Sequence, residues 1–256
     1  MIKITFLGTG TSQGIPVIGS DHPVSFSDDL KDKRLRSSIL IEYKDFNFVI
    51  DCGPDFRQQM LRTNCIKLDA IIFTHEHADH TTGIDDVRPY FFRQGKIPIY
   101  LHERVLNSLH NRFAYIFDPK QKYPGAPDFE VNLITKENDF QILGLNITPI
   151  EAVHYKLPVL GFRLGKFAYL TDVKTISDKE MLKLNGLDTL VINALRYESH
   201  PSHLNIEDAL EIIDQVKPKQ TFFTHISHNM GFHKEVCSSL PESVSLAFDG
   251  LVLEVD

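Results

Sequence analysis

The chain has 256 residues, 42% hydrophobic and 24% charged, which is ample material for a packed core in one domain or two joined halves. Its 34 acidic and 27 basic residues give a net charge of −7, which argues against a nucleic-acid partner. Three cysteines are too few for a disulfide framework, and no apolar run has the length of a signal sequence or membrane span. We therefore expect a cytoplasmic protein without a membrane partner.

The first half of the chain alternates predicted strands and helices. Residues 2–7 alternate apolar and polar side chains as a strand does, and the glycine-rich stretch GTGTSQGIP then ends it. Pro54 suits the first turn of a helix that runs through residues 55–62. The other predicted elements are strands at 37–43, 46–51, 68–74 and 97–101, helices around 83–92 and 103–113, and a loop at 117–127.

The second half is richer in strands. Strands are predicted at 145–153, 157–164, 166–171, 188–194, 220–224, 245–249 and 251–256. One helix opens with the capping box formed by Ser177 and Glu180, and another follows Asn205 over residues 206–216. This order of elements indicates two sheets packed inside helices.

The stretch THEHADHTTG concentrates four metal-competent side chains, His75, His77, Asp79 and His80. In extended chain His75 and His77 point the same way, so they can bind one ion, while Asp79 and His80 can reach a second ion past a turn. The helical HExxH motif is excluded because Asp79 stands where its second histidine belongs. A polar loop that carries histidines by chance is the alternative.

Predicted strands repeatedly end at such side chains: His75, His154, Asp172 and His225. Because strand ends converge at clefts, one site explains these positions better than separate accidents. His154 would complete three nitrogens on the first ion, His225 would join the second ion, and Asp172 could bridge the two. Imidazoles and carboxylates suit zinc, manganese or iron, and the ligand types do not choose among these metals.

The HEHADH motif, with the downstream histidine, aspartate and histidine, resembles the HxHxDH signature of the metallo-β-lactamase superfamily. The resemblance extends over essentially the whole chain and includes FLGTGTSQG and the IDCG that contains Asp51. It implies an α/β fold, an αββα sandwich of two mixed sheets flanked by helices, as a single domain over residues 1–256. It also implies two divalent ions, zinc or manganese, and makes Asp51 a carboxylate that orients a ligand histidine rather than a strand terminator.

A hydroxide held between two ions is a strong nucleophile, so the expected reaction is hydrolysis, with Asp79 both a ligand and part of the catalytic centre. His203 in SHLNIEDAL resembles the histidine that lies near the scissile phosphate in the phosphodiesterase branch of the superfamily, as a proton donor or charge stabiliser. A helix cap or solvated loop is the alternative for His203. His200 is a competing candidate for the same role and for substrate binding.

The stretches THISHNMGFH and GIDDVRPYF resemble the phosphodiesterases that open phosphoribosyl 1,2-cyclic phosphate to ribose 1,5-bisphosphate. Transfer-RNA 3′-processing endonucleases are a near relative, but the long basic arm that holds their RNA has no counterpart in this sequence. We therefore expect a small phosphate ester as the substrate. Arg88 is a candidate for binding its terminal phosphate, with pairing to a carboxylate as the alternative.

One departure concerns the third, structural zinc that the resemblance implies. Its cysteine ligands are replaced in the loop GSDHPVS by Ser20, His22 and Ser25, while His228 stands at the position of its histidine ligand. Neutral serine is a poor zinc ligand, so we predict that this zinc is absent.

Other functions remain open on the sequence alone. The same metal ligands would activate water against a lactone, thioester or β-lactam. A metal-binding or nucleotide-binding regulator without turnover is the alternative from a different class. A homodimer is possible.

Overall fold

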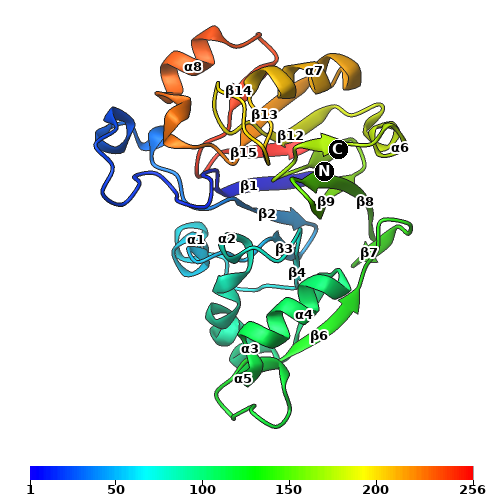
Figure 1. Ribbon diagram of the computed structural model, residues 1–256. Coiled ribbons are helices and arrows are strands. Elements are labelled where there is room, and N and C mark those ends of the chain that lie inside the picture. The colour runs from blue at the N-terminus through cyan, green and yellow to red at the C-terminus, as the bar shows by residue number, and fades with distance from the viewer. Residues whose placement is uncertain (256) are drawn as a thin grey trace.

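The computed structural model describes residues 1–255 and contains two β-sheets with helices on their outer sides (Figure 1). The seven-stranded sheet has the order β15-β1-β2-β3-β4-β5-β6. Its strands are β1 (Ile2–Gly8), β2 (Ser38–Tyr43), β3 (Phe46–Ile50), β4 (Ala70–Ile72), β5 (Ile97–Leu101), β6 (Phe129–Leu133) and β15 (Val252–Val255).

The eight-stranded sheet has the order β11-β8-β9-β10-β12-β13-β14, and β7 pairs with β8. Its strands are β7 (Phe140–Ile142), β8 (Leu145–His154), β9 (Leu157–Leu164), β10 (Phe167–Tyr169), β11 (Thr175–Ile176), β12 (Thr189–Asn193), β13 (Gln220–Thr224) and β14 (Val244–Leu246). Both sheets are mixed: β3 to β6 and β10-β12-β13-β14 pair in parallel, and the hairpin strands pair antiparallel. Parallel strands bring their carboxyl ends to one edge of each sheet, which is where the candidate site lies.

The helices cover the two outer faces of the sandwich (Figure 1). They are α1 (Phe56–Thr63), α2 (Ala78–Thr81), α3 (Arg88–Gln94), α4 (Glu103–Arg112), α5 (Ala114–Phe117), α6 (Asp178–Met181), α7 (Ile206–Val216) and α8 (His233–Ser239). Short 3-10 helices lie at Pro23–Phe26, Leu30–Asp32, Thr82–Val87, Leu182–Leu184 and His228–Met230. Within residues 1–255, no helix is both long and apolar enough to traverse a bilayer.

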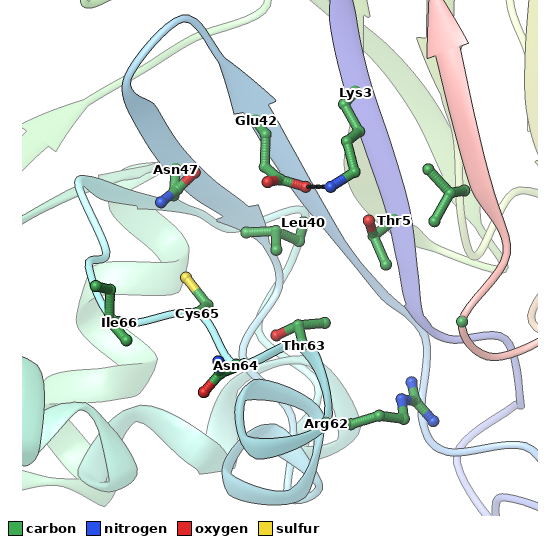
Figure 2. Close-up of a pocket in the computed structure, with 12 residues that line it drawn as sticks. Lys3, Thr5, Leu40, Glu42, Asn47, Arg62, Thr63, Asn64, Cys65 and Ile66 are labelled. Carbon is green, nitrogen blue, oxygen red and sulfur yellow. Dashed lines mark ion pairs between the residues drawn. The ribbon is translucent and has the colours of Figure 1, made fainter.

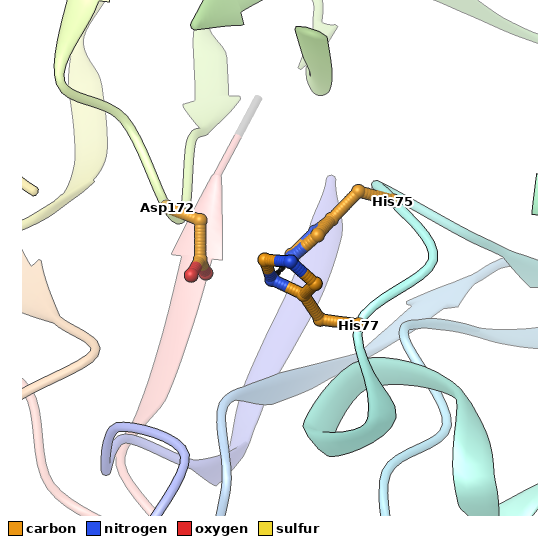
Figure 3. Close-up of side chains that lie close together, drawn as sticks. All are labelled: His75, His77 and Asp172. Atoms are coloured by element: carbon orange, nitrogen blue, oxygen red, sulfur yellow. Dashed lines mark hydrogen bonds between the residues drawn. The ribbon is translucent and has the colours of Figure 1, made fainter. Parts of the chain in front are cut away.

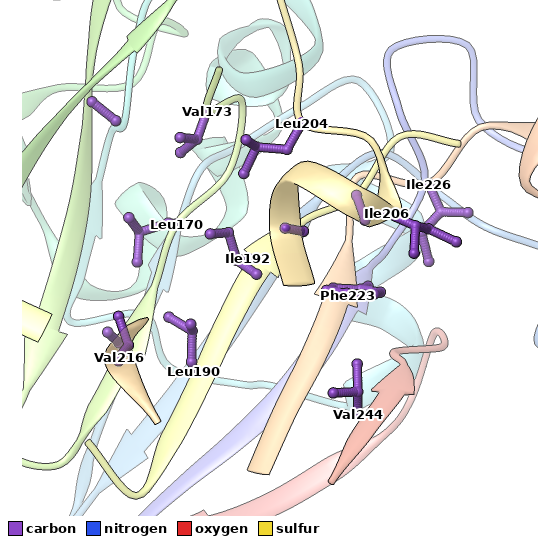
Figure 4. Close-up of a cluster of buried hydrophobic side chains, with 14 of the residues drawn as sticks. Leu170, Val173, Leu190, Ile192, Leu204, Ile206, Val216, Phe223, Ile226 and Val244 are labelled. Atoms are coloured by element: carbon purple, nitrogen blue, oxygen red, sulfur yellow. The ribbon is translucent and has the colours of Figure 1, made fainter. Parts of the chain in front are cut away.

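Three apolar clusters hold these layers together. The central cluster lies between the sheets and combines Ile4 and Phe6 of β1 with Phe162 of β9 and Val191 of β12. A second cluster packs the other face of the seven-stranded sheet against α1, α3 and α4. A third packs the eight-stranded sheet against α7 and α8, with Phe223 fully buried in it (Figure 4). The strands carry apolar side chains on both faces because each sheet packs against the other sheet on one face and against helices on the other.

The predicted αββα sandwich of two mixed sheets is confirmed, and several element bounds differ from those predicted. The predicted helix around 83–92 is a 3-10 helix up to Val87 followed by α3, which has Pro89 in its first turn. The sequence analysis missed α8, β6, β7 and β11, because short segments with few buried side chains carry little periodicity. The side chains of Ser177 and Asn205 cap their helices by accepting from the backbone amides of Glu180 and Asp208, but the Glu180 carboxylate accepts from the amide of Glu151 rather than completing the capping box.

Replacement of Phe223 by Ala should lower the free energy of unfolding by about 3–5 kcal/mol, because it removes a fully buried ring and leaves a cavity. Guanidinium titration monitored by circular dichroism would measure the change. The matched control is Phe92→Ala, because the Phe92 ring is 64% exposed and its loss should have little effect. Equal losses in the two variants would contradict this account of the core.

Candidate metal centre

The predicted metal-competent residues come together where strands of both sheets end. His75 follows β4, Asp79 and His80 lie in the short α2, and His154 is the last residue of β8. Asp172 and His225 follow β10 and β13. The backbone N–H of Leu160 in β9 donates to the carbonyl of Thr74 at 3.0 Å, so a direct hydrogen bond joins the two sheets beside the cluster.

One group of donors consists of His75, His77 and Asp172, whose ligand atoms lie within 4.8 Å of one another. Figure 3 shows the carboxylate of Asp172 facing the two imidazoles from the opposite sheet. Nε2 of His75 and Nδ1 of His77 are 3.0 Å apart. The ring centroid of His154 is 5.1 Å from that of His77, so its imidazole borders the same group. Two imidazole nitrogens and a carboxylate converging on one point suit a divalent cation.

A second group consists of Asp79, His80 and His225, again with ligand atoms within 4.8 Å of one another. Oδ2 of Asp172 lies 3.1 Å from Nε2 of His80 and 3.3 Å from Nδ1 of His225. Asp172 also belongs to a third group with His154 and His203. Because its carboxylate faces donors of all three groups, Asp172 has the position of a bridging ligand.

Each of four histidines has one ring nitrogen engaged by a neighbour, which leaves the other nitrogen facing the cluster. Nδ1 of His75 bonds to the hydroxyl of Thr74, at 2.9 Å, and Nδ1 of His80 donates to Asp51, at 2.7 Å. Nδ1 of His154 donates to the carbonyl of Ser202, and Nε2 of His225 bonds to the hydroxyl of Thr11. The contacts with Asp51, Thr74 and the Ser202 carbonyl fix the tautomers of His80, His75 and His154, and the contact with Thr11 holds the ring of His225 in place.

The histidine ring nitrogens that face the cluster show whether these residues fit a metal. Nε2 of His80 and Nδ1 of His225 are buried and have no hydrogen-bond partner, and the same holds for Nδ1 of His203. Buried polar atoms without partners are costly, and coordination of a cation would satisfy them. The donor set therefore fits a metal site.

The electrostatics of the cluster agree with that fit. Burial lowers the pKa of His75, His77 and His225, so these imidazoles are held neutral, as ligands must be. Burial alone would lower the pKa of His80 too, but the carboxylates of Asp79, Asp172 and Asp51 raise it well above its ordinary value. The cluster thus attracts a positive charge.

Asp51 is fully buried and contacts both groups of ligands. Its carboxylate accepts from His80 directly, and it accepts from the backbone amide and hydroxyl of Thr74, the residue that contacts His75. Burial raises the pKa of Asp51, while His80 and Thr74 act in the opposite direction by stabilising the ionised form. One carboxylate therefore orients a histidine in each group.

Several of these residues have unfavourable backbone conformations. Asp51, Asp172 and His225 have φ values of +66°, +59° and +55°, in the left-handed region that side chains other than glycine rarely adopt. Each follows a strand directly or by a few residues. The left-handed residue turns the chain sharply at the strand end, and such strain is concentrated at functional sites.

The glycine of IDCG allows the close approach that positions Asp79. A Cβ atom on Gly53 would lie 2.1 Å from the carbonyl oxygen of Asp79, and one on Gly83 would lie 2.1 Å from the carbonyl oxygen of Gly53. Only glycine fits at these two contacts, so the backbone after β3 packs directly on the metal loop.

His203 lies among the ligands, and His200 lies beside it. Nδ1 of His203 is 3.8 Å from Oδ1 of Asp172, and its ring centroid is 4.5 Å from that of His154 and 4.9 Å from that of His225. Burial, followed by the proximity of His225, lowers the pKa of His203 to about 3. The His200 ring is 5.1 Å from that of His203 and bonds through Nδ1 to the backbone and hydroxyl of Ser202. Both line a cleft of about 200 Å³ with Arg196 and His228.

Arg88 is engaged elsewhere. Its guanidinium donates to the carboxylate of Asp85 at 2.6 Å and to the carbonyl of Gly125 at 3.1 Å, and it lies over the ring of Tyr123. This is the carboxylate pairing that the sequence analysis gave as the alternative. A phosphate-binding role for Arg88 stays a prediction.

The residues at the position of the third zinc lie close together, but the hydroxyl of Ser25 and Nδ1 of His228 are buried without a hydrogen-bond partner, so the absence of this zinc stays a prediction. The rings of His22 and His228 are 5.1 Å apart, and Nδ1 of His22 accepts from the backbone amide of Val24. Ser20 accepts from the amide of His22. Within residues 1–255, the groups of three or more metal-competent donors do not include His22 or His228.

Another pocket, of about 450 Å³, lies away from the histidines on the outer face of the seven-stranded sheet (Figure 2). Its one carboxylate, Glu42, is paired with Lys3 at 2.7 Å. The pocket is bordered by Arg62, Thr63 and Asn64 at the end of α1. It holds no group of metal ligands and no unpaired acid or base, so we assign it no part in the chemistry.

The sequence analysis missed Thr11, Thr74 and Ser202, which fix the orientation of ligand histidines. Thr11 lies in the GTGTSQG stretch, which the sequence marks only as a turn, and its partner His225 is 214 residues away. Thr74 directly precedes His75, and this adjacency was the one feature of the sequence that could have indicated its role. The role of Ser202 could not be found from the sequence, because every residue has a backbone carbonyl.

Comparisons with known proteins identify the family and the fold. The β-lactamase superfamily domain matches residues 46–226. A crystal structure of a new diphosphatase from the PhnP family is 38% identical, with a TM-score of 0.93 over 100% of this chain and 98% of that chain. The octanoyltransferase of Porphyromonas gingivalis is 38% identical in an alignment of length 257 that covers 100% of this chain and 52% of that protein. Ribonuclease Z of Methanococcus maripaludis is 25% identical in an alignment of length 208 that covers 72% of this chain and 59% of that protein.

The chain thus spans about half the length of these curated relatives. It matches the diphosphatase structure over nearly its full length.

Replacement of Asp51 by Asn should weaken metal binding by about 10–100-fold, because the amide cannot accept from both His80 and Thr74. The change would be measured as metal content, by inductively coupled plasma mass spectrometry, after dialysis against increasing concentrations of a competing chelator. Asp69→Asn is the matched control, since Asp69 accepts from the Asn47 amide far from the ligands. Metal retention equal to that of the unaltered protein would contradict the role given to Asp51.

Proposed function

Because the chain belongs to the metallo-β-lactamase superfamily and is similar over its whole length to a PhnP-family diphosphatase, we propose that it is a metal-dependent hydrolase of small phosphate esters. The single observation that carries this proposal is the pair of ligand groups that Asp172 joins, as a member of the group with His75 and His77 and through its contacts with His80 and His225. Asp79, His80 and His225 would hold one divalent ion, and His75, His77 and His154 the other. Zinc and manganese both suit this set.

The bound ions would supply Lewis acidity that makes water nucleophilic at neutral pH and polarises a phosphoryl oxygen. The chain's own residues hold the ligand histidines and exclude other orientations of their rings. Asp51, Thr74 and the carbonyl of Ser202 keep their imidazoles in the tautomer that presents a lone pair, and Thr11 holds the ring of His225 in place. Asp79 contributes a carboxylate beside His80, at 3.3 Å. Preorganised donors of this kind reduce the reorganisation needed during the reaction.

His203 is placed to act on the substrate. Its ring lies between those of His154 and His225, and Nδ1 has no hydrogen-bond partner. A substrate phosphate at the centre would therefore lie within reach of an imidazole that the ligand set leaves unengaged. We assign His203 to stabilising or protonating the leaving group, because an anionic phosphate beside the ring would raise its pKa, and His200 lies next to it.

A phosphodiester or diphosphate linkage fits best. Phosphoribosyl 1,2-cyclic phosphate, opened to ribose 1,5-bisphosphate, is the first candidate from sequence resemblance. A diphosphate is the second, because the 38% identical structure is that of a diphosphatase. Incubation of both with the protein after chelation and metal restoration, followed by phosphorus NMR, distinguishes them. Absence of hydrolysis of these and of bis(p-nitrophenyl) phosphate would refute the proposal.

Transfer-RNA processing is a further candidate because of the similarity to Ribonuclease Z. The net charge of −7 and the short segment between α5 and β6 favour a small substrate instead. Cleavage of a precursor transfer RNA with a steep salt dependence would favour the nuclease. Octanoyl transfer is not proposed, because the chain covers 52% of the relative that bears that name.

Replacement of His203 by Ala should lower kcat about 100-fold or more while leaving metal content unchanged. The loss should be larger for an alkyl ester than for a p-nitrophenyl ester, because p-nitrophenolate leaves without a proton. Steady-state kinetics on the two esters, with metal analysis of the same samples, would measure this. His200→Ala is the comparison variant. Loss of metal in the His203 variant would instead place His203 among the ligands.

A further inference from the structure

A pocket of about 480 Å³ opens beside the first group of ligands. Two predicted ligands, His77 and His154, form one end of it. The other end is formed by residues to which the proposed reaction gives no role: Tyr155, Lys156 and Leu157 at the turn between β8 and β9, and Pro201 before His203. A volume of this size is within the range that binds small molecules, about 300–1,000 Å³.

Tyr155 is presented to this pocket by a tight turn. His154 pairs with Leu157, so Tyr155 and Lys156 are the two residues of the hairpin loop. Tyr155 has a φ of +59°, and its side chain is 62% exposed. Two-residue loops with a left-handed first residue favour glycine there, and the next hairpin does use Gly165, with a φ of +58°. Neither local conformation nor core packing therefore accounts for an aromatic residue at this position.

Leu143 provides an internal comparison. It occupies the corresponding first position of the loop between β7 and β8, with a φ of +52°, and is 45% exposed. The fold thus tolerates a large side chain at such a position. Tyr155 differs because it directly follows His154 and lines the pocket that His154 enters.

We propose that Tyr155, with Leu157 and Pro201, forms a subsite for the nucleobase of a nucleotide-type phosphate ester whose phosphate lies at the metal centre. This inference rests on the proposed hydrolase function and replaces phosphoribosyl 1,2-cyclic phosphate by a nucleotide-type ester as the preferred substrate. A phosphoribosyl group alone has no flat apolar part to cover the exposed ring of Tyr155. A nucleobase does, because every base presents a π face to an aromatic side chain.

The charges around the pocket suit a nucleotide. Nζ of Lys156 lies 5.3 Å from the centroid of the Tyr155 ring, so a cation borders the subsite. No carboxylate lines the pocket among the residues that the structure describes. Lys156 therefore attracts an anionic ester, whose base can meet the apolar surfaces of Tyr155, Leu157 and Pro201.

Adenosine 5′-monophosphate and ribose 5-phosphate form a matched pair of probes, because they share phosphate and ribose and differ in the base. Isothermal titration of the metal-loaded protein should show about tenfold tighter binding of the adenosine compound, the contribution expected of one stacked base. Tyr155→Gly should reduce this ratio towards one, and Tyr155→Phe should retain it. Tyr155→Gly suits the left-handed turn, so its thermal unfolding midpoint should not fall.

Leu143→Gly is the control, since it makes the same backbone change in a loop away from the pocket and should leave the ratio unchanged. Equal affinity of the unaltered protein for the two probes, or binding of neither at millimolar concentration, would overturn the subsite. So would an undiminished ratio in Tyr155→Gly. Failure of the hydrolase proposal is recognised separately, as absence of turnover of every phosphodiester and diphosphate while the binding ratio persists.

Discussion

The hydrogen bonds of the Asp51 carboxylate are the interaction on which the candidate site depends. Asp51 receives the Nδ1 proton of His80 and the hydroxyl and amide protons of Thr74, and the Thr74 hydroxyl also contacts His75. One fully buried carboxylate thus sets the orientation of a histidine in each group of ligands. It stays in place because β3 ends at Ile50 and the chain turns there through a left-handed residue. The glycine that follows lets the backbone pack against Asp79.

This arrangement explains why the two sheets supply their metal-competent side chains in different ways. The seven-stranded sheet supplies His75, His77, Asp79 and His80 from one short segment, which a carboxylate behind it holds rigid. The eight-stranded sheet supplies single residues from the ends of separate strands, and Asp172 reaches donors of every group. The apolar cluster between the sheets fixes their separation, so the packing of residues such as Phe6 and Phe162 determines whether the donors converge. The cost of gathering imidazoles and carboxylates in a buried cluster is offset when a cation binds.

The surroundings of the metal centre differ on its two sides. His200, His203 and Arg196 line a polar cleft, whereas Tyr155, Leu157 and Pro201 line a more apolar pocket. The segment from His200 to His203 contributes to both, and the carbonyl of Ser202 within it also orients His154. The proposed substrate contacts and the orientation of His154 would therefore be coupled through one short loop.

The sequence by itself determined the class of chemistry, because the spacing of HEHADH and the strands that end at His154, Asp172 and His225 are local patterns of residue type and periodicity. It also determined the αββα layering, since strands apolar on both faces alternate with amphipathic helices. Only the tertiary structure decided which donors face one another: Asp172 contacts all groups, Thr11 meets His225 across 214 residues, and Arg88 turns to Asp85. It alone placed the ring of Tyr155 at a pocket beside His154. These contacts depend on how distant strand ends converge, which no local pattern encodes, because the packing of the whole sandwich sets the distances between them.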